Sequence, residues 1–100
     1  MCLTHSFPTR TMVSAVVLIE AEADKIQDLA RQLVEIDGVP EVFSVAGRYD
    51  LVAILRVREN QDVADIVSGK IRHLDGVAST ETLIAFRVYS REEIEGMFAP

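Results

Sequence analysis

Cysteine is nearly absent from this sequence, because Cys2 is the only one in 100 residues. A single cysteine excludes an intrachain disulfide and any metal site built from several cysteines. Long apolar runs are also missing: Val13–Ile19 contains Ser14 and falls far short of the roughly 20 residues that a membrane helix needs. The sequence therefore predicts a cytoplasmic protein that depends on no disulfide and does not span a membrane.

Basic residues are in the minority, with 10 Lys and Arg against 16 Asp and Glu and a net charge of -6. This excess of negative charge opposes binding to a phosphate backbone, so direct contact with nucleic acid is not expected. Hydrophobic residues make up 49% of the chain, enough to fill the core of one domain. Residues 1–11 lack the apolar stretch of a signal peptide, and we expect them to form a flexible leader ahead of a single domain at 12–100.

The first half of the chain predicts a strand, a helix and a second strand. Residues 12–20 form a short run rich in β-branched side chains, which favours a strand. Asp24 and Gln27 make a capping-box pattern ahead of apolar residues at helical spacing, so a helix is expected to start there and run to Gly38. A second strand is expected at about 41–46.

The second half of the chain repeats this order. Residues 47–50 are a turn signal between two β-rich runs, which predicts a hairpin whose return strand is Leu51–Arg58. Asn60 is expected to cap a second helix that ends at Gly76. The last strand is predicted from about Ser79 to Tyr89.

The two helix exits carry the same signal, since Ile36-Asp37-Gly38-Val39 and Leu74-Asp75-Gly76-Val77 each follow an amphipathic helix and precede a strand. The chain therefore divides into two βαβ halves joined by a hairpin. Two such halves predict the α+β ferredoxin-like fold, βαββαβ, with a four-stranded antiparallel sheet and both helices on one face.

The predicted strands are apolar on both faces. In the first strand Val17 and Ile19 share one face, while Val16 and Leu18 stand on the other. Helices on one side of a sheet can cover only one of these faces. Leaving half a dozen apolar side chains in water would forfeit on the order of 1.5 to 3 kcal/mol each, so the second face needs a cover. A bound hydrophobic ligand or a second copy would provide it, and we expect a dimer that packs through the sheets.

The end of the chain carries a signal of its own. Ser90 and Glu93 make a second capping-box pattern, which predicts a short C-terminal helix at 91–98. The apolar side of this helix could dock on a neighbouring chain or pack back on its own domain, and the sequence leaves both open.

Two segments together resemble a known family. The stretch Ala46–Val52 reads AGRYDLV, and Gly76–Thr82 has the form Gly-Val-x-x-Thr-Glu-Thr. They resemble the effector-binding domain, often called the RAM domain, of the Lrp/AsnC (feast/famine) transcription regulators, over Met12 to about Tyr89. The resemblance implies a ferredoxin-like domain that dimerises through its sheets, assembles into ring-like octamers and binds amino acids or similar small metabolites between subunits. It implies neither catalysis nor a cofactor.

The resemblance assigns six ligand-binding positions, four in an effector loop and two in the last strand: Gly47, Arg48, Tyr49, Asp50, Thr80 and Thr82. Backbone N–H groups at the glycine turn and the arginine suit a carboxylate, and Asp50 suits an α-amino group, a combination that fits a zwitterion. Purely structural roles stay open, because the glycine suits a turn, Asp50 suits nearby backbone amides and threonine suits any strand.

The chain also departs from the family pattern. Lrp/AsnC regulators usually carry an N-terminal helix-turn-helix, and the eleven residues before the first strand are too few for one. We therefore expect a stand-alone, non-enzymatic effector module that acts by itself or by joining a full-length Lrp/AsnC regulator. Two alternatives share the fold: a small dimeric α/β-barrel enzyme of the monooxygenase or isomerase type, with Asp50 and Ser44 as its internal polar candidates, and an ACT-like regulatory domain.

Overall fold

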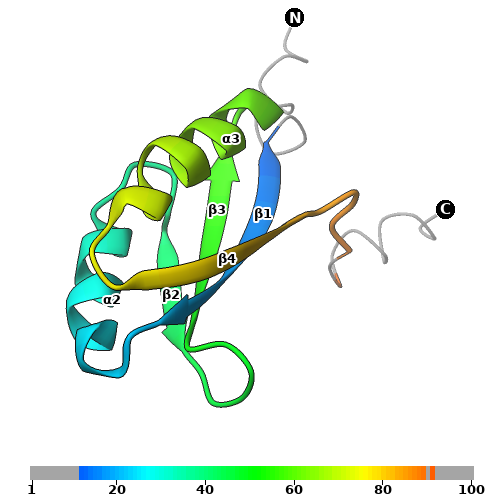
Figure 1. Ribbon diagram of the computed structural model, residues 1–100. Coiled ribbons are helices and arrows are strands. Elements are labelled where there is room, and N and C mark those ends of the chain that lie inside the picture. The colour runs from blue at the N-terminus through cyan, green and yellow to red at the C-terminus, as the bar shows by residue number, and fades with distance from the viewer. Residues whose placement is uncertain (1–11, 90, 92–100) are drawn as a thin grey trace, which may run out of the picture.

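The computed structural model describes residues 12–89 and 91, which form two layers, a curved sheet and two helices packed against one of its faces (Figure 1). The predicted leader at 1–11 and the predicted helix at 91–98, apart from residue 91, lie outside the described residues. The elements follow the order β1 (Val13–Ala21), the short 3-10 helix η2 (Ala23–Lys25), α2 (Ile26–Val34), β2 (Glu41–Ser44), β3 (Leu51–Val57), α3 (Asn60–Gly69), η3 (Ile71–His73) and β4 (Val77–Ile84).

The sheet has the strand order β2-β3-β1-β4, and each neighbouring pair is antiparallel. The two central strands are therefore β1 and β3, while β2 and β4 are the edges. Val17 marks the register at the centre, since it pairs with Ala53 on one side and with Thr82 on the other. The predicted ferredoxin-like fold, with four antiparallel strands and both helices on one face, is confirmed.

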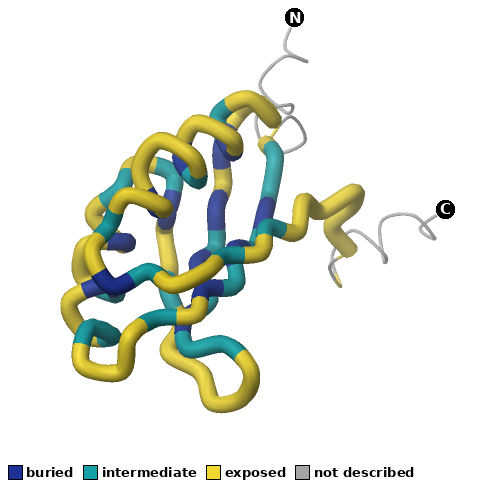
Figure 2. Tube along the Cα trace, viewed as in Figure 1, coloured by how far each residue is buried: buried dark blue, intermediate teal, exposed yellow. Residues whose placement is uncertain are grey.

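The core lies between the sheet and the helices, and Figure 2 shows the buried segments gathered there. Alternate residues of the central strands point into it and are at most 7% exposed, whereas the residues between them are not buried. Each helix contributes the apolar side chains that recur at its own spacing. These are Leu29 and Leu33 from α2 and Val63 and Ile66 from α3.

The helix boundaries differ from the sequence prediction. Asp24 is not an N-cap, because it lies inside η2, and neither η2 nor α2 has a side-chain capping hydrogen bond. Asn60 is likewise the first residue of α3 rather than its cap. The N-cap is Glu59, whose backbone N–H donates to the Asp62 carboxylate at 3.1 Å. Two acidic side chains in the first turn thus cap this helix, a role that the sequence prediction gave to Asn60.

Both helices also end earlier than predicted. The first ends at Val34, and a turn follows in which Val39 N–H donates to the carbonyl of Ile36 at 3.1 Å. The second ends at Gly69 and gives way to η3 before Gly76 is reached. The repeated Asp-Gly signal therefore marks the turn into the next strand rather than the last turn of each helix.

Most strand boundaries contract as well, although β4 begins at Val77 rather than at the predicted Ser79. β2 ends at Ser44 rather than Ala46, β3 at Val57, and β4 at Ile84 rather than Tyr89. At the end of β4, Ala85 N–H donates to the carbonyl of Ser14 at 2.9 Å, and the chain then leaves β1 one residue before the start of that strand at Val13. Residues 85–89 start at this last bond, bend at Phe86 and are exposed.

Gly76 is required by close packing as well as by its backbone. It has φ of 99°, and a Cβ at this position would lie 2.7 Å from the Cβ of Lys25. Its carbonyl accepts a hydrogen bond from Glu22 N–H at 2.9 Å, which joins this turn to the segment ahead of α2. Only glycine combines this backbone with so close an approach.

The other side of the sheet, called the open face below, is covered by neither helix of the described residues (Figure 1). Cross-strand pairing places six apolar side chains on it: Val16, Leu18, Phe43, Val52, Ile54 and Leu83. Phe43 and Leu83 are each 49% exposed, and the others are half-buried by one another. None of the described helices is long and apolar enough to cross a membrane.

Candidate ligand-binding site

The loop between β2 and β3 is fixed to the end of the sheet by Asp50. Val45 N–H donates to the carbonyl of Asp50 at 3.0 Å and closes the loop, while Asp50 N–H donates to the carbonyl of Ile19 at 2.9 Å. A third hydrogen bond of this residue involves its side chain, since the Asp50 carboxylate accepts from the backbone N–H of Ala21 at 2.8 Å. Asp50 therefore holds the loop against β1, and one of its oxygens is committed to the backbone.

Gly47 and Arg48 form the exposed tip of this loop. Gly47 has φ of 134°, which favours glycine, and a Cβ there would meet nothing within 4 Å. The guanidinium carbon of Arg48 lies 5.8 Å from the centre of the Tyr49 ring, within reach of a cation–π contact. The loop thus presents one positive charge to solvent, backed by an aromatic ring.

Tyr49 connects the loop to the far edge of the sheet. Its hydroxyl donates a hydrogen bond of 2.6 Å to the carboxylate of Glu81 on β4. Because β1 lies between β3 and β4, this side chain spans the open face at the Glu20 end of β1. The bond to the negatively charged Glu81 raises the pKa of Tyr49 above its ordinary value, since removing the phenolic proton would place two negative charges side by side.

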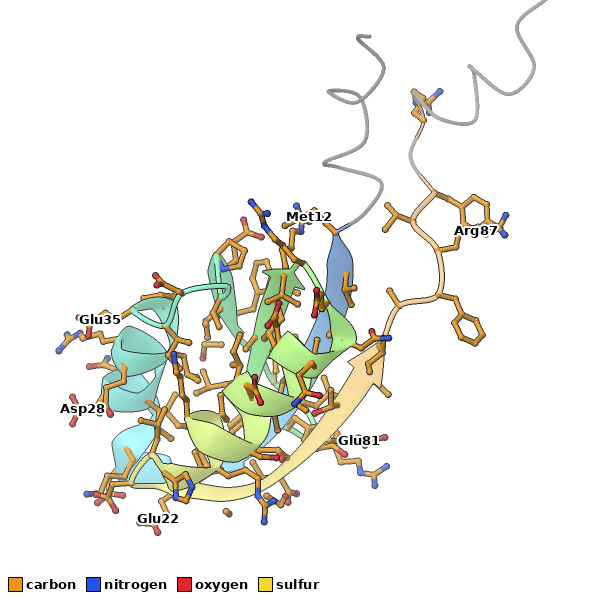
Figure 3. All side chains as sticks on the ribbon, turned by 90° about the horizontal axis from the view of Figure 1, so that it is seen from above. Met12, Glu22, Asp28, Glu35, Glu81 and Arg87 are labelled. Atoms are coloured by element: carbon orange, nitrogen blue, oxygen red, sulfur yellow. The ribbon has the colours of Figure 1, made fainter. Side chains whose placement is uncertain are left out.

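Two further polar residues lie at the same end of the open face. Glu20 and Ser79 are cross-strand partners, and the Ser79 hydroxyl donates a hydrogen bond to the Glu20 carboxylate. Glu81, labelled in Figure 3, follows on the same face of β4 as the partner of Leu18. These three residues were not among the positions assigned from sequence. The available signal was the strand alternation, which places Glu81 on the opposite face from both of its neighbours.

Those neighbours, Thr80 and Thr82, lie on the helix side of the sheet. They pair with Ile19 and Val17, which are fully buried in the core, and both threonines are half-buried. The structure therefore brings Gly47, Arg48, Tyr49 and Asp50 together in one loop but does not bring the two threonines to it. Within the segment Thr80–Thr82, the residue that the loop contacts is Glu81.

The charges at this end of the open face have both signs. The Arg48 guanidinium is exposed, and the carboxylates of Glu81 and Glu20 lie on the adjoining strands. A cation suits a carboxylate group and a carboxylate suits an ammonium group, so the combination can hold a zwitterion. No group of three or more His, Cys, Asp or Glu side chains that could hold a metal ion occurs within 12–89 and 91.

The layer between sheet and helices offers a different environment. All the buried side chains of the described core are apolar, and none of the polar or charged ones is buried there. Ser44 is exposed, and Asp50, the other internal polar residue considered for an enzyme, is half-buried and bonded to Ala21 N–H. The polar and charged residues of the candidate site therefore lie at the rim of the open face, and none of them lies inside the described core.

The described residues therefore form a small two-layer α+β domain that carries a loop of mixed charge at the rim of its open face. The model of the family described as "Lrp/AsnC ligand binding domain" matches residues 14–94. The chain belongs to this family, as the resemblance in the loop and the last strand indicated.

Relatives of the chain include regulators and shorter proteins. A helix-turn-helix-type transcriptional regulator of Pyrococcus furiosus, PF0250, is 37% identical over 81% of this chain and 55% of its own length. The chain thus spans about half the length of the curated relatives that it matches. Among solved structures, TTHA0845 of Thermus thermophilus is 43% identical with a TM-score of 0.76, over 79% of this chain and 99% of that one. AsnC of E. coli is 25% identical with a TM-score of 0.72, over 76% and 52% respectively.

Proposed function

We propose that this chain is an effector-binding and oligomerisation module that takes a free amino acid, or a similar small zwitterion, between its subunits. The family of ligand-binding domains to which it belongs supports this class of function. The observation that carries the proposal is the open face. Its six apolar side chains adjoin a loop that has both a positively charged and a negatively charged side chain, the two groups that a zwitterion needs as partners. No catalytic step is part of the proposal, in keeping with relatives that are transcription regulators.

A second copy of the chain covers the open face in this proposal. A domain of this size has a total stability of only about 5 to 15 kcal/mol, so six apolar side chains left half in water are a considerable loss. Facing sheets of two copies interdigitate such side chains at a separation of about 10 Å. Twofold pairing uses the same patch on both chains, and the paired unit can assemble further into a ring such as an octamer.

The amino acid binds against the loop in this proposal. Arg48 and backbone N–H groups near Gly47 hold the α-carboxylate, and carboxylates at the rim hold the α-ammonium group, with Tyr49 packing between them. Asp50 positions the loop through its bond to Ala21 N–H and contributes its remaining carboxylate oxygen. Thr80 and Thr82 lie on the helix side of the edge strand β4, so they do not face the loop of their own chain. In this proposal they contact the amino acid bound by another subunit that packs at the β4 edge.

The proposed role also includes a protein partner in the cytoplasm. A full-length Lrp/AsnC regulator presents a related domain, and co-assembly with it would pass the binding event to a DNA-binding chain without direct contact between this acidic chain and DNA.

The test combines mass measurement in solution with thermal unfolding in the presence of a panel of amino acids. We expect an assembly with an even number of chains, and stabilisation by the cognate amino acid of about 2.7 kcal/mol at 100 times its dissociation constant. Arg48→Ala is expected to abolish this ligand-induced stabilisation and to leave the fold unchanged, because Arg48 is exposed. Arg72→Ala is the matched control, since it removes an exposed arginine from η3 instead.

A chain that is monomeric at all concentrations and unaffected by every amino acid would contradict the proposal. Retained stabilisation in Arg48→Ala would leave the module in place but move the binding site away from the loop.

A further inference from the structure

Three carboxylates lie where the loop between β2 and β3 meets the open face, and together they are called the acidic patch below. Asp50 belongs to the loop, Glu20 to β1 and Glu81 to β4. Glu81 pairs with Leu18, two residues before Glu20 on the same face, so the two glutamates are diagonal neighbours on adjacent strands. The patch therefore sets negative charges close together beside the candidate site.

Neither glutamate has a positively charged partner within the described residues. Each accepts a hydrogen bond from a neutral hydroxyl, Glu81 from Tyr49 at 2.6 Å and Glu20 from Ser79. The ion pairs of residues 12–89 and 91 lie elsewhere, around η2 and α2. The bond to Glu81 is the main cause of the raised pKa of Tyr49, and the charge of Glu20 adds to it, so both carboxylates lie near one hydroxyl. A cation placed between them would be stabilised by both.

The loop alone supplies partners for the backbone groups of an amino acid. Arg48 carries the only positive charge of the loop and suits the α-carboxylate, and the remaining oxygen of Asp50 suits the α-ammonium group. A neutral amino acid therefore leaves Glu20 and Glu81 without a counter-charge, and an acidic one adds a further negative charge beside them. A second positive group on the ligand would neutralise them.

We propose that the effector of this site is an amino acid with a cationic side chain, such as lysine or arginine, whose charged end binds between Glu20 and Glu81. This inference rests on the proposed function and adds the chemical class of the amino acid. The loop then binds the groups that all amino acids share, and the two glutamates on the sheet select the side chain.

The length of such a side chain suits the distance that Tyr49 covers. Tyr49 starts in the loop next to Asp50, and its hydroxyl meets Glu81 on the far side of β1. A lysine side chain is about as long as that of tyrosine, and arginine is slightly longer. Their methylene stems are apolar and suit the neighbouring surface of the open face, where Leu18 pairs with Val52.

Calorimetric titration of the full chain with matched ligands tests the charge. L-Norleucine is lysine without its terminal ammonium group, and L-citrulline has a neutral urea group where arginine has its guanidinium. In at least one of these pairs the charged member is expected to bind about tenfold or more tightly, the effect of one hydrogen bond to a charged group. Cadaverine, which is lysine without its carboxylate, is expected to bind more weakly than lysine because it offers Arg48 no partner.

Substitution of the two glutamates locates the selectivity. Glu81→Gln and Glu20→Gln each keep the shape of an exposed side chain and remove its charge, so each is expected to lower the preference for the charged ligand several-fold. Glu41→Gln is the matched control, since it removes an exposed glutamate from β2, on the other edge of the sheet, and changes the net charge of the chain by the same amount. The control is expected to keep the wild-type preference.

The outcomes separate this inference from the proposed function. Neutral amino acids that bind as tightly as the charged ones, or more tightly, overturn the cationic effector while the proposed function stands. A preference that falls equally in Glu41→Gln also overturns it, because the preference would then come from the net charge of the chain. Cadaverine binding more tightly than every amino acid, or no binding of any amino acid, overturns both.

Discussion

The two faces of the sheet are built from similar aliphatic side chains, yet only one of them has a cover within the described chain. On the helix side Val17, Ile19 and Leu55 are fully buried. On the open side their neighbours along the same strands, Val16, Leu18 and Ile54, are half-buried by the sheet alone. The difference comes from the helices and not from the strands, because α2 and α3 lie on the same side.

This comparison separates what folds the chain from what the chain can bind. Residues that the helices cover contribute their burial to the stability of the monomer, because their side chains are already out of water there. Residues of the open face are only partly buried in the monomer, and the rest of their apolar surface leaves water only when another molecule binds there. Substitutions on the two faces are therefore expected to act on different equilibria, one on folding and the other on association.

The largest effect is expected from Leu55→Ala on the helix side. Leu55 is fully buried, and its truncation leaves a cavity that should lower the free energy of unfolding by about 2 to 5 kcal/mol. Urea denaturation at concentrations where the chain is monomeric measures this loss. Leu18→Ala is the matched control on the open face, where about 1 kcal/mol is expected because the side chain is only partly buried. Equal losses in the two variants would mean that the faces do not differ in the monomer.

A smaller loss is expected at the turn that holds α2 to the sheet. Gly76→Ala places a Cβ 2.7 Å from the Cβ of Lys25 in a backbone with φ of 99°. Strain of about 1 to 3 kcal/mol is expected from the backbone alone, and the collision adds to it. Gly47→Ala, in the loop at the open face, carries backbone strain without the collision, since nothing lies within 4 Å of its Cβ. Urea denaturation should therefore rank Gly76→Ala as the more destabilised, and the reverse order would contradict the close contact.

The sequence was sufficient for the fold because the fold depends on local patterns. Strand alternation, helical spacing and the repeated Asp-Gly exits gave the element order, and the apolar residues on both strand faces predicted the open face. The boundaries were less accurate where a contact between distant residues decides them. β4 ends at Ile84 where the chain leaves β1 after the bond from Ala85 to Ser14, although the β-forming residues Phe86 and Val88 favour a longer strand.

The candidate site shows the same limit. Loop residues 47–50 were found from their own motif, and the structure keeps them together. Glu81 was missed in favour of Thr80 and Thr82, since its contact with Tyr49 joins residues 32 positions apart and depends on the order of strands in the sheet. The resemblance in the last strand indicated the two threonines, whose residue type also suits any strand.

The polar pair at the open face gives a pH-dependent test. The hydrogen bond to Glu81 raises the pKa of Tyr49, so its stabilising effect is present below the unfolded value of about 10 and is lost as pH rises through the higher folded pKa. In a Tyr89→Phe background Tyr49 is the only tyrosine, and its absorbance at 295 nm reports its ionisation. Glu81→Gln is expected to lower the midpoint of this titration. An unchanged midpoint would show that the two side chains do not interact in solution.

The polar pair on the helix side is expected to give the smallest effect. Lys25 Nζ lies 2.8 Å from the Asp75 carboxylate, and the pair joins the start of α2 to the turn before β4. The hydrogen bond to the ammonium group lowers the pKa of Asp75 and raises that of Lys25. A lowered carboxyl pKa stabilises the fold above the unfolded value of about 3.9, and this contribution disappears as pH falls through the folded pKa. Carboxyl NMR titration should therefore find Asp75 titrating at higher pH in Lys25→Met than in wild type. Because water screens both partners, Asp75→Asn is expected to change stability at pH 7 by less than either glycine substitution, and a larger loss would mean that this pair, rather than apolar packing, fastens α2 to the sheet.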